Sequence, residues 1–179
     1  DIKILDLEMS EKELPRGEDG EIAICGAQVM KGYWNKPEET AAVFQDIAGK
    51  RYFLTGDIGH IDEDGFIVIT DRKKDLVLVG GFNVYPREVE DILFEHPKVA
   101  MAAVIGIPDD RSGESVKAFI QVKPGETVTE DEILAYCKKN MAGYKRPRQI
   151  DFREELPVSA VGKVLRRVLR DEELEKNQG

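Results

Sequence analysis

Cysteine, histidine and tryptophan are scarce in this sequence of 179 residues, which holds two cysteines, two histidines and one tryptophan. Cys25 and Cys137 both lie in apolar patterns, so we predict small core residues rather than a disulfide, a metal pair or a nucleophile. His60 and His96 cannot complete a zinc site with them, because no recognisable ligand spacing is present. We therefore predict no metal ligands in this sequence.

Long apolar runs are also lacking, since no stretch approaches the ~20 residues that a membrane-spanning helix needs. No signal peptide is recognisable, and the chain opens on Asp1 within a strand-like segment, "DIKILDLE". We therefore expect a piece of a longer protein, in which missing targeting segments carry little information. With 41% hydrophobic and 34% charged residues, the composition is that of a soluble globular protein.

Negative charge predominates overall, at a net −9. Residues 143–170 reverse this balance, with eight basic and three acidic side chains, which is a net +5. A basic patch in an acidic protein suggests a polyanionic partner, although by composition alone a solvated helix face with ordinary ion pairs is the better explanation. Nucleic acid is excluded as the expected partner, because the patch is short and the remaining surface should repel it.

Residues 1–70 are predicted to form short strands and turns, since apolar residues alternate or run in strand-length pieces such as "EIAICG" and "FIVIT". "DEDG" predicts a tight hairpin turn in which Gly65 has positive φ. "NKPEETAAVF" predicts a short helix with Pro37 in its first turn. We expect a small twisted sheet or barrel here. The charged segment 71–75 that follows is a candidate domain boundary, with a simple hairpin turn as the alternative.

Residues 76–155 alternate between predicted strands and helices, which is the order expected of an α+β domain. One helix has Thr129 and Glu132 spaced as a capping box. Apolar residues at helical spacing predict a last helix over residues 163–176. The expected fold class is therefore α+β, with a small β-rich, barrel-like segment followed by a compact α+β C-terminal domain.

Two glycine-containing motifs are candidates for ligand binding. "TGD", Thr55 to Asp57, places a carboxylate after a glycine turn at the end of an aromatic strand piece, where it can accept two hydrogen bonds from a vicinal diol such as a ribose. The alternative is that Gly56 and Asp57 simply form a turn, which is the usual reason for an aspartate after a glycine. Gly80 and Gly81, between a strand and a helix, permit either a close backbone approach by a ligand or a simple bend.

Lys163 is the third candidate, because it follows Gly162 in a turn-like lead-in, "PVSAVG". A lysine delivered by a mobile loop is a suitable point charge for a phosphate or a developing anion. The alternative is an ordinary surface lysine at a helix start. A cation is unfavourable near a helix N-terminus, which favours a functional reason.

Together these motifs resemble, in order and spacing, the C-terminal part of the acyl- and aryl-CoA synthetases. Those enzymes belong to the adenylate-forming superfamily, which also includes luciferases and peptide-synthetase adenylation domains. The similarity covers almost the whole chain and is most like the long-chain fatty-acid–CoA ligases. It is carried by "GEIAICGAQVMKGYWNKPEET", "YFLTGDIGHIDEDGFIVITDRKKDLVLVGGFNVYPREVE", "GYKRPRQIDF" and "LPVSAVGKVLRR".

The resemblance implies a two-step reaction and a set of nucleotide-binding residues. ATP and a carboxylic acid would give acyl-AMP, and coenzyme A would then displace AMP, with a rotation of the C-terminal domain between the steps. Asp57 would accept hydrogen bonds from the ribose, and Arg72 would contact the ribose or phosphate side of the nucleotide. Lys74 would be the hinge residue. Lys163 would be catalytic, bridging the carboxylate and the α-phosphate during adenylation.

The resemblance also implies a site for coenzyme A. Gly80 and Gly81 would line the pantetheine tunnel, and Tyr144, Arg146 and Arg148 would hold the adenine and phosphates of coenzyme A. The implied division of the chain is 1–72, the last piece of the large adenylation domain, and 73–179, the mobile small domain. A cytoplasmic location, with peripheral association at a membrane surface as an option, would suit a fatty-acid substrate.

Two departures from the family pattern limit these expectations. Several relatives carry a second lysine in the strand after the hinge, where this sequence has Leu78. The phosphate loop, the Mg²⁺ ligands and the acyl pocket are expected in a missing N-terminal domain upstream of Asp1, so we expect this piece alone to be inactive. The alternatives are a ligase for another acid, short- or medium-chain or aryl, an adenylate-forming enzyme that never uses coenzyme A, and a non-catalytic binding module.

Overall fold

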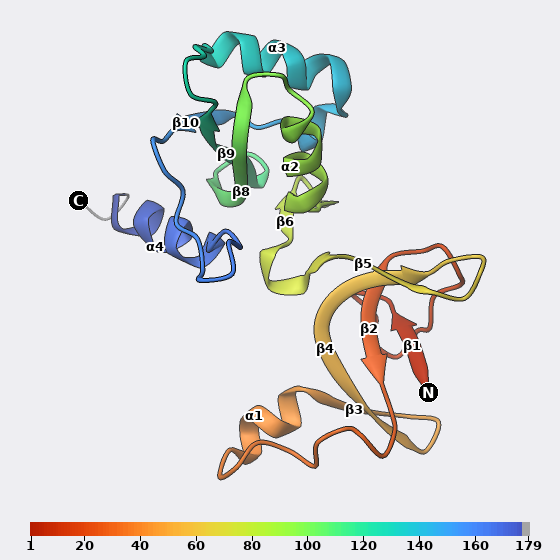
Figure 1. Cartoon of the computed structure of the whole chain (residues 1–179). Helices are drawn as coiled ribbons and strands as arrows, with labels where there is room; N and C mark the ends of the chain where they lie inside the picture. The colour runs from red at the N-terminus through yellow and green to blue at the C-terminus, as the bar shows by residue number, and fades with distance from the viewer. Residues whose placement is uncertain (177–179) are drawn as a thin grey trace. The chain divides into compact units, whose positions relative to one another are not determined.

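The computed structural model describes residues 1–176 and consists of two compact units (Figure 1). The first unit is Asp1–Lys74, and the second begins at Asp75. The boundary falls within the charged segment 71–75, two residues after the division expected between residues 72 and 73. Each unit is described by itself.

The first unit is a curled antiparallel sheet with one short helix. Its strands are ordered β1-β2-β4-β3, and β5 also pairs with β4. The long strand β4 bends strongly, which curls the sheet (Figure 1) and confirms the barrel-like expectation. The small core is formed by Leu5, Ala23 and Tyr52. The elements are β1 (Ile2–Leu5), β2 (Gly20–Ile24), α1 (Pro37–Ala42), β3 (Phe44–Ile47), β4 (Lys50–Ile61) and β5 (Ile67–Arg72).

The second unit is α+β, as predicted. Its sheet has the order β10-β9-β6-β7, with β8 paired to β9. The pairs are antiparallel except for β10 and β9, which run parallel. A 3₁₀ turn, η1 (Lys73–Asp75), leads in from the first unit. The other elements are β6 (Val77–Val79), β7 (Phe82–Val84), α2 (Pro86–Phe94), β8 (Val99–Asp109), β9 (Gly113–Val122), α3 (Glu130–Asn140), η2 (Gly143–Lys145), β10 (Gln149–Phe152) and α4 (Arg166–Lys176).

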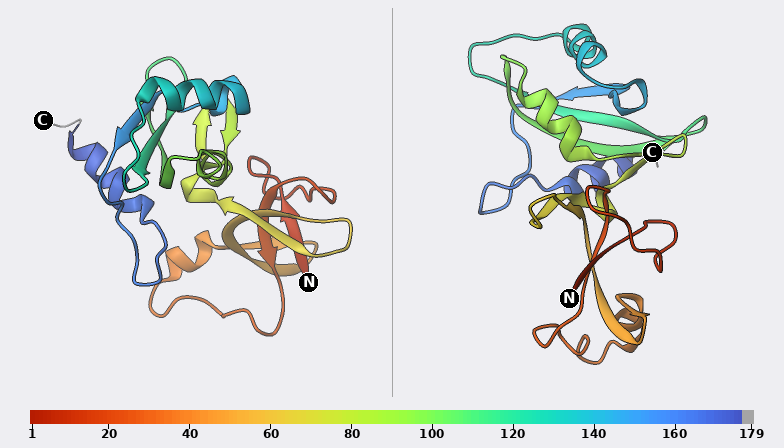
Figure 2. Two further views of the ribbon diagram at one scale, coloured as in Figure 1. Left: turned by 45° about the horizontal axis from the view of Figure 1, so that its top comes forward. Right: turned by 90° about the vertical axis from the view of Figure 1, so that its right-hand side faces the viewer.

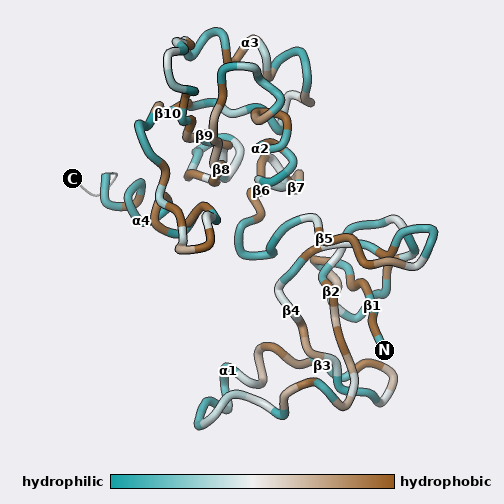
Figure 3. Tube along the Cα trace, viewed as in Figure 1, coloured by the Kyte–Doolittle hydropathy of each residue, from teal (hydrophilic) through white to brown (hydrophobic). Residues whose placement is uncertain are grey.

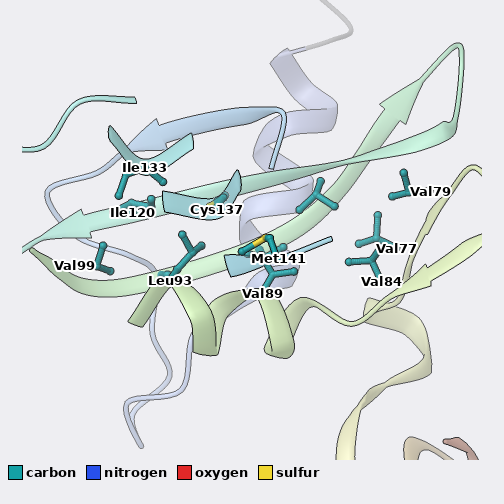
Figure 4. Close-up of a cluster of buried hydrophobic side chains, with 14 residues drawn as sticks. Val77, Val79, Val84, Val89, Leu93, Val99, Ile120, Ile133, Cys137 and Met141 are labelled. Atoms are coloured by element: carbon teal, nitrogen blue, oxygen red, sulfur yellow. The ribbon is translucent and has the colours of Figure 1, made fainter. Parts of the chain in front are cut away.

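Helices cover both faces of this second sheet (Figure 2). Successive side chains of a strand point to opposite faces, so Ala102 and Val104 of β8 join one core while Ala103 and Ile105 join the other. Helices α2 and α3 close the first core (Figure 4), and Leu169 of α4 closes the second. This explains why β8 is a nearly continuous apolar run in the sequence (Figure 3) rather than an alternating one.

Several local predictions are confirmed. Gly65 has φ +88° in the turn between β4 and β5, and Pro37 is in the first turn of α1. The Thr129 side chain accepts a hydrogen bond from the Glu132 N–H at the start of α3. The last helix is a correction, because α4 begins at Arg166 and leaves Lys163 in the preceding turn.

Candidate functional site

A β-bulge in the first unit carries Thr55, Gly56 and Asp57. Opposite β2, the register shifts so that three residues of β4 face the single residue Ile22. Gly56 has φ +73°, which glycine adopts without strain. The Thr55 hydroxyl donates to the Ile22 carbonyl at 2.8 Å and accepts the Asp57 N–H at 3.1 Å. The motif therefore lies within a long strand, not at its end as expected, and the bulge fixes the direction of Asp57.

A pocket of about 460 Å³ opens beside this bulge, and it brings together three of the predicted residues. Its lining consists of Thr55, Gly56, Asp57, Arg72, Lys73 and Lys74. Arg72 Nε lies 3.3 Å from Asp57 Oδ1, and both side chains keep part of their surface open to solvent. A carboxylate and a guanidinium at this spacing can bind hydroxyl and phosphate oxygens side by side.

Glu21 and Lys73 support the pocket, and the sequence analysis missed both. Glu21 is buried in β2, and its carboxylate accepts from Lys73 Nζ at 2.6 Å and from the Gly56 N–H at 3.3 Å. Glu21 therefore braces the bulge from the side of β2. The sequence offered one indication of a role for Glu21, which is that an acidic residue stands in the otherwise apolar strand "EIAI". The predicted hinge residue, Lys74, is exposed and is the last residue of the first unit.

In the second unit, Gly80 and Gly81 form the two-residue turn of the hairpin between β6 and β7, rather than a bend between a strand and a helix. Their φ values are +57° and +84°, as in a type I′ turn. Nothing lies within 4 Å of a Cβ built on either residue. Within this chain the backbone conformation explains both glycines, because a side chain would have room but would be strained.

Tyr144 and Arg148 lie on either side of this hairpin. The Tyr144 ring stacks on Phe82, the residue after Gly81, with centroids 4.8 Å apart. Arg148 Nη1 lies 3.6 Å from Asp109 Oδ2, and that carboxylate accepts from Ser112, whose carbonyl accepts the Gly80 N–H. Hydrogen bonds from the Ser112 hydroxyl and N–H hold the pKa of Asp109 below its usual value.

The third basic-patch residue, Arg146, is positioned differently. Its side chain is half-buried, and Nε donates to the Met141 carbonyl at 3.0 Å. Arg146 therefore ties the segment after α3 to the η2 turn, while Tyr144 and Arg148 remain exposed. Phe82 was not predicted as a site residue. Its 57% exposure is unusual for a phenylalanine and becomes evident only in the structure.

Lys163 ends a tight turn that begins at Ser159. The Ser159 N–H donates to the Lys163 carbonyl at 2.8 Å, and the Ser159 Oγ accepts the Lys163 N–H at 3.1 Å. Gly162 has φ +76°, and Val158 bridges Val164 across the base of the turn. Within residues 1–176, Lys163 Nζ has no hydrogen-bond or ion-pair partner, and the side chain is exposed. The turn thus presents a cation to the surroundings.

Other features bear on the class of protein. In the part of the chain that the structure describes, no group of three or more His, Cys, Asp or Glu side chains could hold a metal ion. Among the same residues, none of the helices is long and apolar enough to span a membrane. Cys137 is buried as predicted, and burial raises the pKa of its thiol to about 11.

Comparison with known proteins gives a consistent family. Residues 88–163 match the AMP-binding enzyme C-terminal domain. A long-chain-fatty-acid–CoA ligase of Bacillus subtilis is 51% identical over 89% of this chain and 28% of its own length. A 3-[(3aS,4S,7aS)-7a-methyl-1,5-dioxo-octahydro-1H-inden-4-yl]propanoyl:CoA ligase of Rhodococcus jostii is 46% identical over 89% of this chain and 30% of its length.

A solved structure is similar along most of the chain. ATP-bound MatB from Rhodopseudomonas palustris has a TM-score of 0.89 and 41% identity, covering 96% of this chain and 33% of MatB. The chain thus spans about 30% of the length of the relatives it matches. Residues 88–163 thus match the C-terminal domain of AMP-binding enzymes, and the chain is similar in sequence to two CoA ligases along 89% of its length.

Proposed function

We propose that this chain is part of an ATP-dependent, AMP-forming fatty-acid–CoA ligase. In the first step a carboxylate oxygen of the fatty acid attacks the α-phosphorus of ATP, and the bond to the β-phosphate oxygen breaks to release pyrophosphate. In the second step the thiolate of coenzyme A attacks the acyl carbon, and the bond to AMP breaks. Mg²⁺ would neutralise charge on the ATP phosphates from ligands outside the described residues.

The observation that carries this proposal is the presentation of Lys163. The Ser159–Lys163 turn holds the backbone by three hydrogen bonds, while the amine has no partner among the described residues. A constrained backbone with an unpaired cation suits a group that stabilises negative charge supplied by a substrate. We assign Lys163 to adenylation, where it would bridge the attacking carboxylate and the α-phosphate.

The pocket beside the bulge would hold the rest of the nucleotide. Asp57 would accept hydrogen bonds from both ribose hydroxyls, and its side chain is one-third exposed for this purpose. Arg72 would contact the ribose or the phosphates from its place 3.3 Å from Asp57. Lys74 would be the hinge, and its position at the end of the first unit supports this role.

Coenzyme A would bind along the hairpin of the second unit. The side-chain-free turn of Gly80 and Gly81 would let the pantetheine pass, because any Cβ there would project into open space. The exposed Tyr144 and Arg148, which flank this turn, would contact the adenine and phosphates. Arg146 would act mainly by holding η2 in place, since its Nε already donates to Met141.

The substrate and the limits of the fragment follow from the same proposal. The Bacillus subtilis relative supports a long-chain fatty acid, while the Rhodococcus jostii relative favours a second candidate, a ligase for a bulkier ring-bearing acid. Residues 1–72 would be the end of the large adenylation domain and 73–179 the mobile small domain. We expect the 179-residue piece alone to show no ATP–pyrophosphate exchange.

The test separates the two half-reactions in the full-length enzyme. Lys163→Ala should lower ATP–pyrophosphate exchange by about 10²–10³-fold, because a charge-stabilising group is lost. Thioester formation from a supplied acyl-adenylate should stay near the wild-type rate. Arg167→Ala, an exposed cation four residues away, is the matched control and should change neither. Equal loss of both half-reactions in Lys163→Ala would contradict the assignment.

A further inference from the structure

Helix α4, which follows the Lys163 turn, begins with an unusual charge pattern. Arg166 and Arg167 lie in its first turn, which contains no acidic residue. Positive charge at a helix N-terminus is opposed by the helix dipole. The Arg166 side chain is nevertheless only 16% exposed. Helix formation alone therefore does not explain an arginine at this position.

Two carboxylates from different elements surround Arg166. Its Nε and Nη2 donate to the two oxygens of Glu90 in α2, at 2.9 and 2.5 Å, which is the paired geometry that guanidinium and carboxylate favour. Its Nη1 lies 3.3 Å from Asp75 Oδ2 in η1. Arg170, one helical turn later, donates to the other oxygen of Asp75. Arg166 thus links η1, α2 and α4.

The carboxylates are themselves held in place. Glu90 Oε1 accepts the Val104 N–H at 2.8 Å, so the network is anchored to the central strand β8. The side chains of Asp75 and Glu90 are 10% and 11% exposed. Burying such a network costs desolvation that a well-packed apolar cluster would avoid, so its benefit is better sought in fixing geometry than in stability.

Short connections join this network to Lys163. Arg166 is three residues after Lys163, and the Leu165 N–H donates to the Pro157 carbonyl at 2.8 Å, across the base of the turn. At the other end, Asp75 directly follows Lys74 as the first residue of the second unit. One set of ionic contacts therefore joins the segment at the unit boundary to the segment that presents Lys163.

We propose that Asp75, Glu90 and Arg166 form a positioning network that fixes the Lys163 turn relative to Asp75, the first residue of the second unit. The proposal rests on the proposed role of Lys163 in adenylation. The network touches no reacting atom. It would make the amine arrive at one position when the second unit turns about the boundary, and a misplacement of about 1 Å can cost about 10²-fold in rate.

The experiment uses Arg166→Lys in the full-length enzyme. Lysine keeps the charge but cannot reach two carboxylates as a planar fork. We expect the kcat of ATP–pyrophosphate exchange to fall about 10–100-fold. The KM for ATP and the rate of thioester formation from supplied acyl-adenylate should each change by less than about 3-fold, because neither depends on where the amine lies. Asp75→Asn should also lower the rate of adenylation relative to the rate of thioester formation. This second variant tests the proposal if Arg166→Lys fails to fold.

Two controls separate positioning from stability. Arg167→Lys, on the exposed side of the same turn, should change nothing. Glu173→Gln removes the charge from a buried ion pair with Lys117 at the other end of α4, so it should lower the melting temperature while leaving the ratio of the half-reactions unchanged. A ratio that moves in Arg166→Lys but not in Glu173→Gln supports the network.

The other outcomes overturn the proposal. If Arg166→Lys lowers both half-reactions equally, as loss of folded enzyme would, the network is only structural. If Lys163→Ala abolishes adenylation while Arg166→Lys and Asp75→Asn leave it intact, the network has no positioning role although the proposed function stands. If Lys163→Ala leaves adenylation intact, the proposed function itself is wrong, and the network proposal falls with it.

Discussion

The two units use apolar strands in opposite ways. In the second unit, β8 is buried on both faces, by α2 and α3 on one side and by α4 on the other. In the first unit, the hairpin strand β5 begins with three apolar residues, yet Ile67 is 40% and Ile69 54% exposed. The second unit therefore completes its own core, whereas the first leaves an apolar strand uncovered by the described residues.

This difference shows what an apolar run can and cannot predict. "FIVIT" and "VAMAAVIGI" both predict strands, and both are strands. Burial depends on which elements pack on each face, and that is decided by segments far away in the chain. The buried apolar side chains of the first unit are the small cluster around Tyr52 together with Ile4, Ile22 and Ile58, so its core is much smaller than that of the second unit.

The largest expected effect comes from separating the units. Residues 75–179 expressed alone should unfold in one cooperative thermal transition, because two cores stabilise the sheet. Residues 1–74 alone should show no cooperative transition, since small domains with little buried surface are marginally stable. Calorimetry and near-ultraviolet circular dichroism would measure both. A sharp transition for residues 1–74 would contradict the claim that only the second unit is stable by itself.

A smaller effect tests single side chains in the two units. Leu169 of α4 is fully buried, so Leu169→Ala should lower the free energy of unfolding by about 2–5 kcal/mol. Ile69→Ala on the open strand β5 should change it by less than about 0.5 kcal/mol. Denaturant titration of the whole chain gives both values. A cost at Ile69 as large as that at Leu169 would mean that β5 is covered.

The smallest expected effect is the pH dependence contributed by Glu173 in the second unit. Burial opposes its charge, but hydrogen bonds from Lys117 and Lys176 outweigh burial and leave its pKa below the usual value of 4.5. A lowered folded pKa adds stability above pH 4.5 that is lost as the pH falls through the folded pKa.

Glu173→Gln should therefore cost about 1–3 kcal/mol at pH 7, because Lys117 loses its charged partner. The cost should shrink as the pH drops below 4.5, where the carboxyl is protonated in the unfolded chain, and it should be lost below the lowered folded pKa, where the folded wild-type carboxyl is neutral too. Unfolding of residues 75–179 at several pH values would measure it. A cost that is constant from pH 7 to pH 3 would show that the charge of Glu173 adds nothing.

Local sequence patterns predicted much of the fold. Thr129 begins α3 and Gly65 turns the β4–β5 hairpin because these features depend on neighbouring residues. The predicted start of α4 at residue 163 was wrong, since the helix begins at Arg166. Helical spacing of apolar residues from Val164 onward takes no account of the pairing between Val158 and Val164. That pairing depends on a turn conformation, with Gly162 at positive φ, which spacing does not describe.

The candidate site was predictable where a motif is contiguous. Asp57 is predicted from the motif "TGD", whereas Arg72 and Lys74 are predicted only from the family resemblance, and all three line one pocket. Glu21 was missed because it reaches the pocket from a strand more than thirty residues away, and only the register of β2 on β4 brings it there. Arg166 was likewise seen only as part of a helix, since its partners lie 76 and 91 residues earlier.

The most direct test of the account is the position of Lys163 in the intact enzyme bound to ATP or to an unreactive acyl-adenylate analogue. A crystal structure of that complex should place Lys163 Nζ within about 4 Å of an α-phosphate or carboxylate oxygen, the distance of an ion pair. The Ser159–Lys163 turn should keep the hydrogen bonds described above. An amine facing bulk water in the adenylate-bound enzyme, far from every reacting oxygen, would contradict the central claim.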